Sequence, residues 1–170
     1  NSTSTTISFA ERTDYHIDGY GNDAGALDLD GDGKPEIFGT VNGPDEISIF
    51  KNTSVPGTAS FTAKIDLPTG SWPSTVSAGD LDGDSKADLV VSNTNSGGIS
   101  IFKNNSSVGS LTFLPKTDIA TGGSVFGNGI NDLNGDGKPD LYVPNFNSGT
   151  LSLLANNSTS GTISFQPKSD

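Results

Sequence analysis

The chain has 170 residues, a formal net charge of −11 and a sequence pI near 4.2. Only 31% of the residues are hydrophobic, which argues against a large helical core and favours short strands with one apolar side. Its nine Lys and Arg residues are scattered singly, which argues against nucleic-acid binding, and the absence of Cys excludes disulfides and zinc–thiolate sites. No apolar run approaches the ~20 residues that cross a bilayer, so no membrane span is expected.

Three motifs recur along the chain at a step of 52 residues. The Asp-rich motif Asp28–Glu36 returns at Asp80–Asp88 and at Asp132–Asp140. A second motif, Ile47–Phe50, returns twice at the same step, and a third, Ile7–Phe9, returns three times. No insertion or deletion interrupts the register, so the chain consists of copies of one structural unit.

Each unit is predicted to contain four short strands, because its apolar residues alternate with period two and helical periodicity is absent. Turn sequences such as Asn42-Gly-Pro44 and Asn147-Ser-Gly149 separate the apolar runs. In chain order, the expected strands cover residues 25–28, 36–41, 46–51 and 59–66, then 75–79, 88–92, 98–103 and 111–118, then 127–131, 140–143, 150–155 and 162–168.

Repeats of about 50 residues with four antiparallel strands are typical of β-propeller blades. We therefore expect an all-β fold of three four-stranded antiparallel repeats, with an extra outer strand at the N-terminus. Within a single propeller segment of residues 1–170, residues 1–14 are the outer strand of a preceding or shared blade. Residues 15–66, 67–118 and 119–170 are blades 1, 2 and 3. A β-sandwich is the alternative, although it requires no equal spacing.

Three blades are too few to close a ring, because propellers typically use 4–8 blades. Two explanations remain open. Either the chain is a segment of a longer propeller, or copies associate through open strand edges to complete a ring or to extend the array.

The Asp-rich motif predicts a metal-binding loop. Its positions 1, 3, 5 and 9 carry side-chain oxygens, and position 7 contributes a backbone carbonyl; hard oxygen ligands of this kind are those that Ca²⁺ takes. Nitrogen and sulfur ligands are missing, which argues against zinc and copper. We expect three Ca²⁺ ions per chain, bound by Asp28, Asp30, Asp32, Lys34 and Glu36, by Asp80, Asp82, Asp84, Lys86 and Asp88, and by Asp132, Asn134, Asp136, Lys138 and Asp140.

The three loops differ in two places. Ser85 stands where the other loops have Gly33 and Gly137, residues that permit a sharp backbone turn, and Asn134 leaves the third loop with three charges. Together the loops hold 11 of the 20 acidic residues, and three bound Ca²⁺ ions would reduce the net charge from −11 to −5. Without a cation, these carboxylates would only repel one another.

An EF-hand is the main competing interpretation of the Asp-rich motif. It requires a bidentate Glu at position 12 and flanking helices. Gly39, Val91 and Val143 occupy that position here, and strands are expected to follow. The EF-hand and the related dockerin-type helical pair are therefore rejected.

The segment Gly79–Val91, followed by Gly98–Phe102, resembles the FG-GAP/VCBS repeat family. That family includes the calcium-binding blades of integrin α-subunit propellers and of many secreted bacterial proteins. The resemblance implies that calcium lies on one face of the disc, between the first and second strands of each blade, and that the chain is extracellular or at the cell surface. Family members are mostly adhesion, carbohydrate-binding or scaffold modules, sometimes attached to enzymes.

The loops between successive units lie at the opposite end from the metal loops and carry aromatic residues. Tyr20 and Trp72 are equivalent positions one repeat apart, and Phe126 belongs to the corresponding third loop. Aromatic residues among Asn, Ser and Gly are typical of a sugar-binding or protein-binding face, so these three are the candidate ligand-binding residues. Packing of Trp72 between blades, as part of the core, is the alternative.

No catalytic residue and no enzyme activity are expected. His16, the only His, has no recognisable Ser or Cys partner, and the carboxylates that could form acid–base pairs are assigned to metal. Asn-X-Ser/Thr sequences are either turn formers or glycosylation sites; they begin at Asn1, Asn52, Asn104, Asn105, Asn156 and Asn157.

The sequence thus predicts a calcium-binding extracellular recognition, adhesion or scaffold module, in which calcium makes each blade rigid. Its ligand would be a protein or a carbohydrate. Two alternatives remain: a structural subunit that self-associates into a ring or filament, and an accessory domain of a secreted hydrolase.

Overall fold

The computed structural model describes residues 11–62 and 64–168, which form eleven strands and no helix. Within these residues there is accordingly no helix that could cross a membrane. The outer strand predicted for residues 1–14 lies largely outside the described residues. Its described part, residues 11–14, has no strand structure, and neither do residues 15–19.

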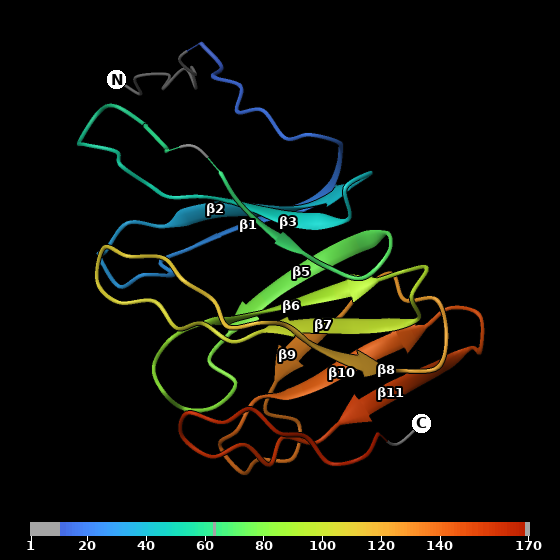
Figure 1. Cartoon of the computed structure of the whole chain (residues 1–170). Helices are drawn as coiled ribbons and strands as arrows, with labels where there is room; N and C mark the ends of the chain where they lie inside the picture. The colour runs from blue at the N-terminus through green and yellow to red at the C-terminus, as the bar shows by residue number, and fades with distance from the viewer. Residues whose placement is uncertain (1–10, 63, 169–170) are drawn as a thin grey trace, which may run out of the picture.

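The strands form three antiparallel sheets (Figure 1). In each sheet the strands follow one another in sequence order, as in a meander. Sheet 1 contains β1 (Tyr20–Leu27), β2 (Glu36–Asn42), β3 (Glu46–Phe50) and β4 (Ile65–Pro68); sheet 2 contains β5 (Pro73–Gly79), β6 (Asp88–Asn93), β7 (Gly98–Phe102) and β8 (Thr117–Ala120); sheet 3 contains β9 (Gly129–Asn131), β10 (Asp140–Asn145) and β11 (Thr150–Leu154). The all-β prediction is confirmed, with four strands in sheets 1 and 2 and three in the described part of sheet 3.

In sheets 1 and 2 the fourth strand begins later than predicted, at Ile65 and Thr117, and the strand predicted at 162–168 is replaced in the described residues by isolated bridges. After β3 the chain first makes a separate hairpin, closed by the Val55–Thr58 bridge and joined at its base by the Asn52–Phe61 bridge, and only then enters β4. The reason is local: the Asn52 side chain bonds to the backbone at Pro35 and Ser54, and so interrupts the regular ladder. The same hairpin recurs after β7 and β11.

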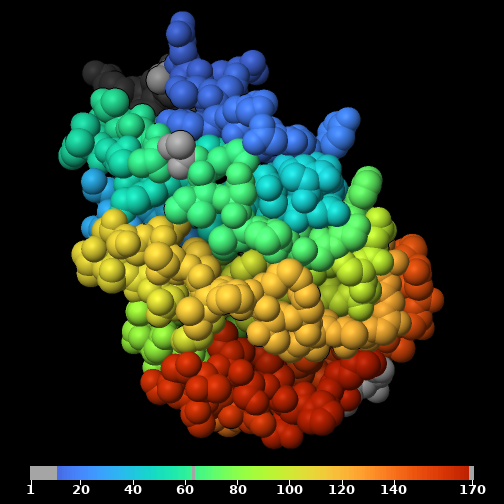
Figure 2. All heavy atoms as spheres, viewed as in Figure 1, coloured from blue at the N-terminus to red at the C-terminus, as the bar shows by residue number. Residues whose placement is uncertain are grey.

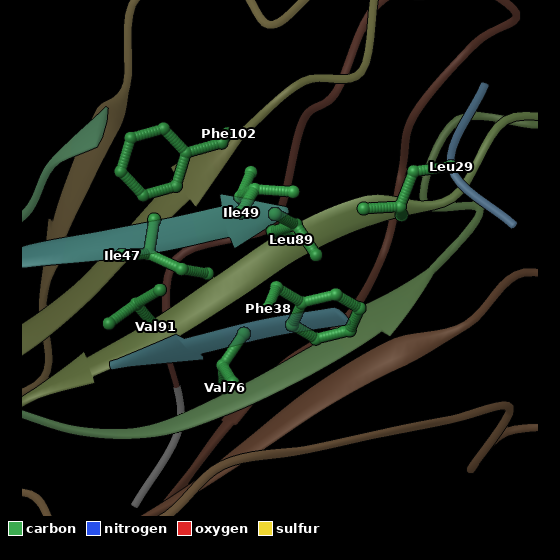
Figure 3. Packing of buried hydrophobic residues seen from close by; sticks show 8 residues of the cluster. All are labelled: Leu29, Phe38, Ile47, Ile49, Val76, Leu89, Val91 and Phe102. Carbon is green, nitrogen blue, oxygen red and sulfur yellow. The ribbon is translucent and has the colours of Figure 1, made fainter. Parts of the chain in front are cut away.

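The three sheets lie face to face in chain order (Figures 1 and 2). The core fills the two spaces between them. In the first space, Ile47 and Ile49 of β3 pack against Leu89 and Val91 of β6 (Figure 3). Val90, between these two β6 residues, points to the opposite side and joins the second cluster, between sheets 2 and 3. Both faces of sheet 2 are therefore buried, which explains why β6 contains three consecutive apolar residues, Leu89 to Val91.

Candidate metal centres

The three Asp-rich loops lie at the same end of their sheets, each between the first and the second strand. Loop 1 (28–36) joins β1 to β2, loop 2 (80–88) joins β5 to β6, and loop 3 (132–140) joins β9 to β10. The acid at position 9 is in each case the first residue of the second strand. The repeat therefore fixes one loop geometry three times.

The acid at position 1 closes the loop on itself. Oδ1 of Asp28 accepts a hydrogen bond from the Gly31 amide and Oδ2 accepts one from the Gly33 amide, both at 2.8 Å. Loops 2 and 3 repeat this pair of bonds at Asp80 and Asp132. The backbone amides in loop 3 lower the pKa of Asp132, led by the Gly137 amide, so this carboxylate stays ionised.

The acids at positions 3 and 5 each leave one oxygen free of backbone contacts. In loop 1, Oδ1 of Asp30 accepts from the Asp32 amide, and Oδ1 of Asp32 accepts from the Lys34 amide at 2.9 Å. Asp28, Asp30 and Asp32 each place a carboxylate oxygen within 4.8 Å of the others, and so do Asp80, Asp82 and Asp88 in loop 2. This spacing is what a single oxygen-bound cation requires.

The acid at position 9 is buried and ties the loop to the hairpin. Oδ2 of Asp88 accepts from the Leu81 amide at 3.0 Å, and Oδ1 accepts from the Asn104 amide at 2.8 Å. Glu36 and Asp140 make the equivalent pair of bonds. Burial raises the pKa of Asp88 to about 6, although the two amides oppose this shift. A buried carboxylate of this kind gains from a nearby cation.

A lysine from the third strand's end contacts the free oxygens of loops 1 and 2. Lys103 Nζ bonds to Oδ2 of Asp82 and, at 2.8 Å, to Oδ2 of Asp84; Lys51 Nζ makes the same contact with Oδ2 of Asp30. Burial lowers the pKa of Lys103, but the bonds to these carboxylates outweigh it and raise the pKa to about 12. The lysine is therefore a permanent internal cation of the loop.

Loop 3 has no such lysine. The position equivalent to Lys51 and Lys103 is Ala155, and the Asn134 amide donates to Oδ2 of Asp136 at 3.3 Å instead. Loop 3 thus lacks both one acid and the lysine. The two differences cancel in net charge.

A buried Asn in the second and third hairpins joins neighbouring sheets at the Asp-rich loops. Asn104 Nδ2 donates to the carbonyl of Leu29 in loop 1 and to that of Ala87 in loop 2, at 2.8 and 2.9 Å. Asn156 makes the equivalent bonds to Leu81 and Pro139. Asn52, Asn104 and Asn156 are all buried, whereas Asn105 and Asn157 are exposed. The first three are structural residues, and loops 1 and 2 are each held by the next sheet as well as by their own.

Ser85 adopts the left-handed backbone expected at a glycine position. Its φ is 68°, close to the 84° and 85° of Gly33 and Gly137. A side chain in this region is strained, so the sequence prediction of a strained turn in loop 2 agrees with the backbone.

The predicted aromatic residues lie at the opposite end of the sheets and are exposed. Tyr20 opens β1, Trp72 immediately precedes β5, and Phe126 packs edge-on against Phe146 with ring centres 5.4 Å apart. Trp72 is 50% exposed and has a φ of 59°. The alternative of a core tryptophan does not agree with this exposure, and a large residue in the left-handed region is strained.

One acidic cluster was not predicted from the sequence. Asp18, Glu46 and Asp66 gather around Lys64, which is bonded to all three. Burial opposes the charge on Lys64, but these bonds outweigh it and raise its pKa. The cluster already has its cation. His16 lies beside it at the surface, 3.0 Å from Asp18.

In loops 1 and 2 the structure brings three of the predicted carboxylates together, whereas within the described residues the acids of loop 3 form no such cluster. Sequence reasoning missed the lysines and the bridging asparagines. The signal was present in the repeat, because Lys51 and Lys103 occupy one repeat position, as do Asn52, Asn104 and Asn156.

A model of the FG-GAP-like repeat family matches residues 28–91 and 80–143. Each match begins at the first Asp of one metal loop and ends in the strand that follows the next loop. No curated protein and no solved structure matches the chain significantly. The two family matches share loop 2 and together span more than half of the chain, and the chain therefore belongs to the FG-GAP-like repeat family.

Proposed function

We propose that this chain is a calcium-stabilised, non-catalytic recognition or scaffold module with propeller-type blades, acting outside the cell or at its surface. The observation that carries the proposal is the geometry of the Asp-rich loops, where three carboxylate oxygens approach within 4.8 Å in loops 1 and 2. FG-GAP repeats are typical of extracellular adhesion and recognition modules, which agrees with this function.

The donor set fits Ca²⁺. All side-chain donors in the loops are oxygens, and the bridge from Lys103 to Asp82 and Asp84 marks the point where a positive charge is stabilised. A bound Ca²⁺ would cross-link the first and second strands of its sheet through positions 1, 3, 5 and 9, with the carbonyl of position 7. It would also stiffen the contact with the next sheet, because Asn104 holds the Leu29 carbonyl of loop 1.

The internal lysines are expected to weaken calcium binding, because Lys51 and Lys103 contact the same carboxylate oxygens that Ca²⁺ would use. Replacing either lysine by Ala should raise the calcium affinity of its own loop. Repulsion between the lysine ammonium and a Ca²⁺ ion several Å away costs on the order of 1–2 kcal/mol of binding free energy, or roughly a 5–30-fold change in Kd. The reciprocal change, Ala155→Lys, should lower the affinity of loop 3. Calorimetric titration with CaCl₂ measures both.

Lys116→Ala is the matched control, because Lys116 pairs with Asp118 away from the loops. It should leave all calcium affinities unchanged. A fall in affinity in Lys51→Ala and Lys103→Ala would contradict the competition between lysine and calcium.

The exposed aromatic end is the proposed recognition face. Trp72 combines 50% exposure with a φ of 59°, and its backbone is held there by hydrogen bonds with Asp45 and Thr94. Strain of this kind concentrates at ligand sites. A carbohydrate or protein ligand would stack on Trp72 and Tyr20, with Phe126 as a third contact.

Substitution of Trp72 separates recognition from stability. Trp72→Gly should be more stable than Trp72→Ala by about 1 kcal/mol, because glycine adopts positive φ without strain. Both variants should lose binding on an array of mono- and oligosaccharides. If wild type binds no glycan, or if Trp72→Gly binds as wild type does, the carbohydrate-recognition role is wrong and the structural role is favoured. Thermal denaturation gives the stability comparison.

A further inference from the structure

Sheet 3 exposes an apolar face whose counterparts are buried elsewhere in the chain. Tyr142, Leu151 and Leu153 are 37%, 50% and 40% exposed. One repeat earlier, the same positions are Val90, Ile99 and Ile101, which are at most 3% exposed because sheet 3 covers them. Two repeats earlier they are Phe38, Ile47 and Ile49, which sheet 2 covers. The exposed face of sheet 3 thus carries apolar residues at the repeat positions that are covered by another sheet in sheets 1 and 2.

The outer face of sheet 1, on which no other sheet of the described residues packs, has the complementary pattern. Its residues Ile37 and Phe50 correspond to Leu89 and Phe102, which pack against the preceding sheet. Ala24 and Gly39 stand where sheet 2 has Val76 and Val91, so this face is hollowed. A groove of about 540 Å³ lies on this face, and Ala24, Ile37, Gly39 and Phe50 are among the residues that line it. The smaller side chains leave room for Tyr142, which is the larger counterpart of Val90 on the opposite face.

The segment before β1 already lies where the outer strand of a preceding sheet belongs. Tyr15 packs edge-on against Phe50 and Phe61, with ring centres 5.7 and 5.3 Å apart. Leu67, Phe102 and Phe113 are the equivalents of Tyr15, Phe50 and Phe61 one repeat later. They also belong to one packed group, because Leu67 and Phe113 pack against the core cluster that contains Phe102.

The charged residues of this segment also match those of the outer strands of sheets 1 and 2. Arg12 and Asp14 are 3.3 Å apart, and their repeat equivalents Lys64–Asp66 and Lys116–Asp118 are also ion pairs that flank β4 and β8. Residues 12–15 therefore carry the sequence and the contacts of an outer strand. In the described part of sheet 3, β11 is the edge strand, whereas β3 and β7 pair with β4 and β8.

We propose that a second copy of this chain binds head to tail, with its sheet 3 packed on the outer face of sheet 1. Continuity with the interfaces inside the chain points to a second copy, because both new faces use the repeat positions that form the contacts between sheets 1 and 2 and between sheets 2 and 3. The two faces lie at opposite ends of the stack of sheets (Figures 1 and 2).

The association does not rest on the calcium proposal. The net charge of −11 opposes contact between copies, and either bound cations or salt would reduce that repulsion. The measurement is therefore made both in CaCl₂ and in chelator with 0.5 M NaCl. Association in salt without calcium would separate this interface from metal binding.

Sedimentation velocity of the full chain tests the proposal. Wild type should sediment as species of at least twice 17.4 kDa, in a concentration-dependent manner. Ala24→Asp on one face and Leu151→Asp on the other should each give monomers, because each buries a charge in the interface. Val108→Asp is the matched control; Val108 is 79% exposed on the central sheet's hairpin, away from both faces, and should associate as wild type does.

Mixing the two monomeric variants distinguishes a head-to-tail interface from a symmetric one. Ala24→Asp retains an intact sheet 3 face, and Leu151→Asp retains an intact sheet 1 face, so the mixture should form a 1:1 dimer. A symmetric contact between two sheet 3 faces would leave Ala24→Asp associated and would not be restored by mixing. A wild-type monomer in both buffers, or a mixture that stays monomeric, would overturn the proposal. Circular dichroism melting confirms that both variants are folded.

Discussion

Chelation of calcium is expected to lower the melting temperature by roughly 10–30 °C. Calcium at 10–100 times Kd stabilises each folded site by about 1.4–2.7 kcal/mol, so three independent sites contribute roughly 4–8 kcal/mol. For a domain of this size, 1 kcal/mol corresponds to about 2–4 °C. Extracellular calcium modules bind with Kd on the order of 10⁻⁴–10⁻³ M, so 10 mM CaCl₂ provides the required excess. Differential scanning calorimetry with CaCl₂ and with EDTA measures the shift. Magnesium should restore it poorly, because Mg²⁺ requires a tighter octahedron.

Replacing Asp32, Asp84 and Asp136 together by Ala should abolish the response to calcium. These residues occupy position 5 of the three loops, and each leaves one carboxylate oxygen free of backbone contacts. A variant with Glu11→Ala and Asp14→Ala removes two exposed carboxylates outside the loops and should retain the full response. A triple variant that responds as wild type does would place the calcium elsewhere.

Asp88→Ala is expected to destabilise the chain by about 4 kcal/mol, even in chelator. Asp88 is fully buried, and its removal leaves the Leu81 and Asn104 amides without acceptors. Each buried amide that loses its partner costs about 1–3 kcal/mol. Asp88→Asn keeps one acceptor oxygen and should lose about half as much. Urea denaturation in EDTA measures the difference.

Asp80→Ala provides the control for this prediction. Asp80 also accepts two backbone amides, from Gly83 and Ser85, but these bonds lie at the surface, where water replaces the lost acceptor. In chelator, Asp80→Ala should lower the free energy of unfolding by about 1 kcal/mol. If Asp80→Ala and Asp88→Ala lose equal stability, the buried carboxylate is not the anchor that joins loop 2 to its hairpin.

The sequence predicted the features that depend on short-range patterns. The first three strands of each unit follow from alternation of apolar residues, and their observed ends in sheets 2 and 3 lie within two residues of the prediction. In sheet 1, β1 begins five residues earlier than predicted, at Tyr20, because a bulge between Gly21 and Ala24 extends its pairing with β2. The clustering of acids in loops 1 and 2 follows from alternate spacing within nine residues.

Contacts between units could not be predicted, because they depend on which hairpin overlies which loop. Asn104 and Leu29 are 75 residues apart, and Lys51 reaches the Gly109 carbonyl of the next sheet's hairpin. The fourth strand was misplaced for a related reason: the Ala59–Phe61 motif has strand-like alternation, but the Asn52 side chain takes the backbone partners that a regular ladder would need. Side-chain competition of this kind leaves no trace in the apolar pattern.

Calcium binding by the three loops is the basis of the proposed function. Equilibrium dialysis of the purified chain against radiolabelled calcium at millimolar concentration counts the bound ions directly. We predict saturation at three Ca²⁺ per chain, loss of all three in the triple variant of Asp32, Asp84 and Asp136, and no displacement by an equal concentration of Mg²⁺. Binding of no calcium by the wild-type chain at 10 mM CaCl₂ would contradict the account, because the Asp-rich loops would then be turns held by their own amides and lysines.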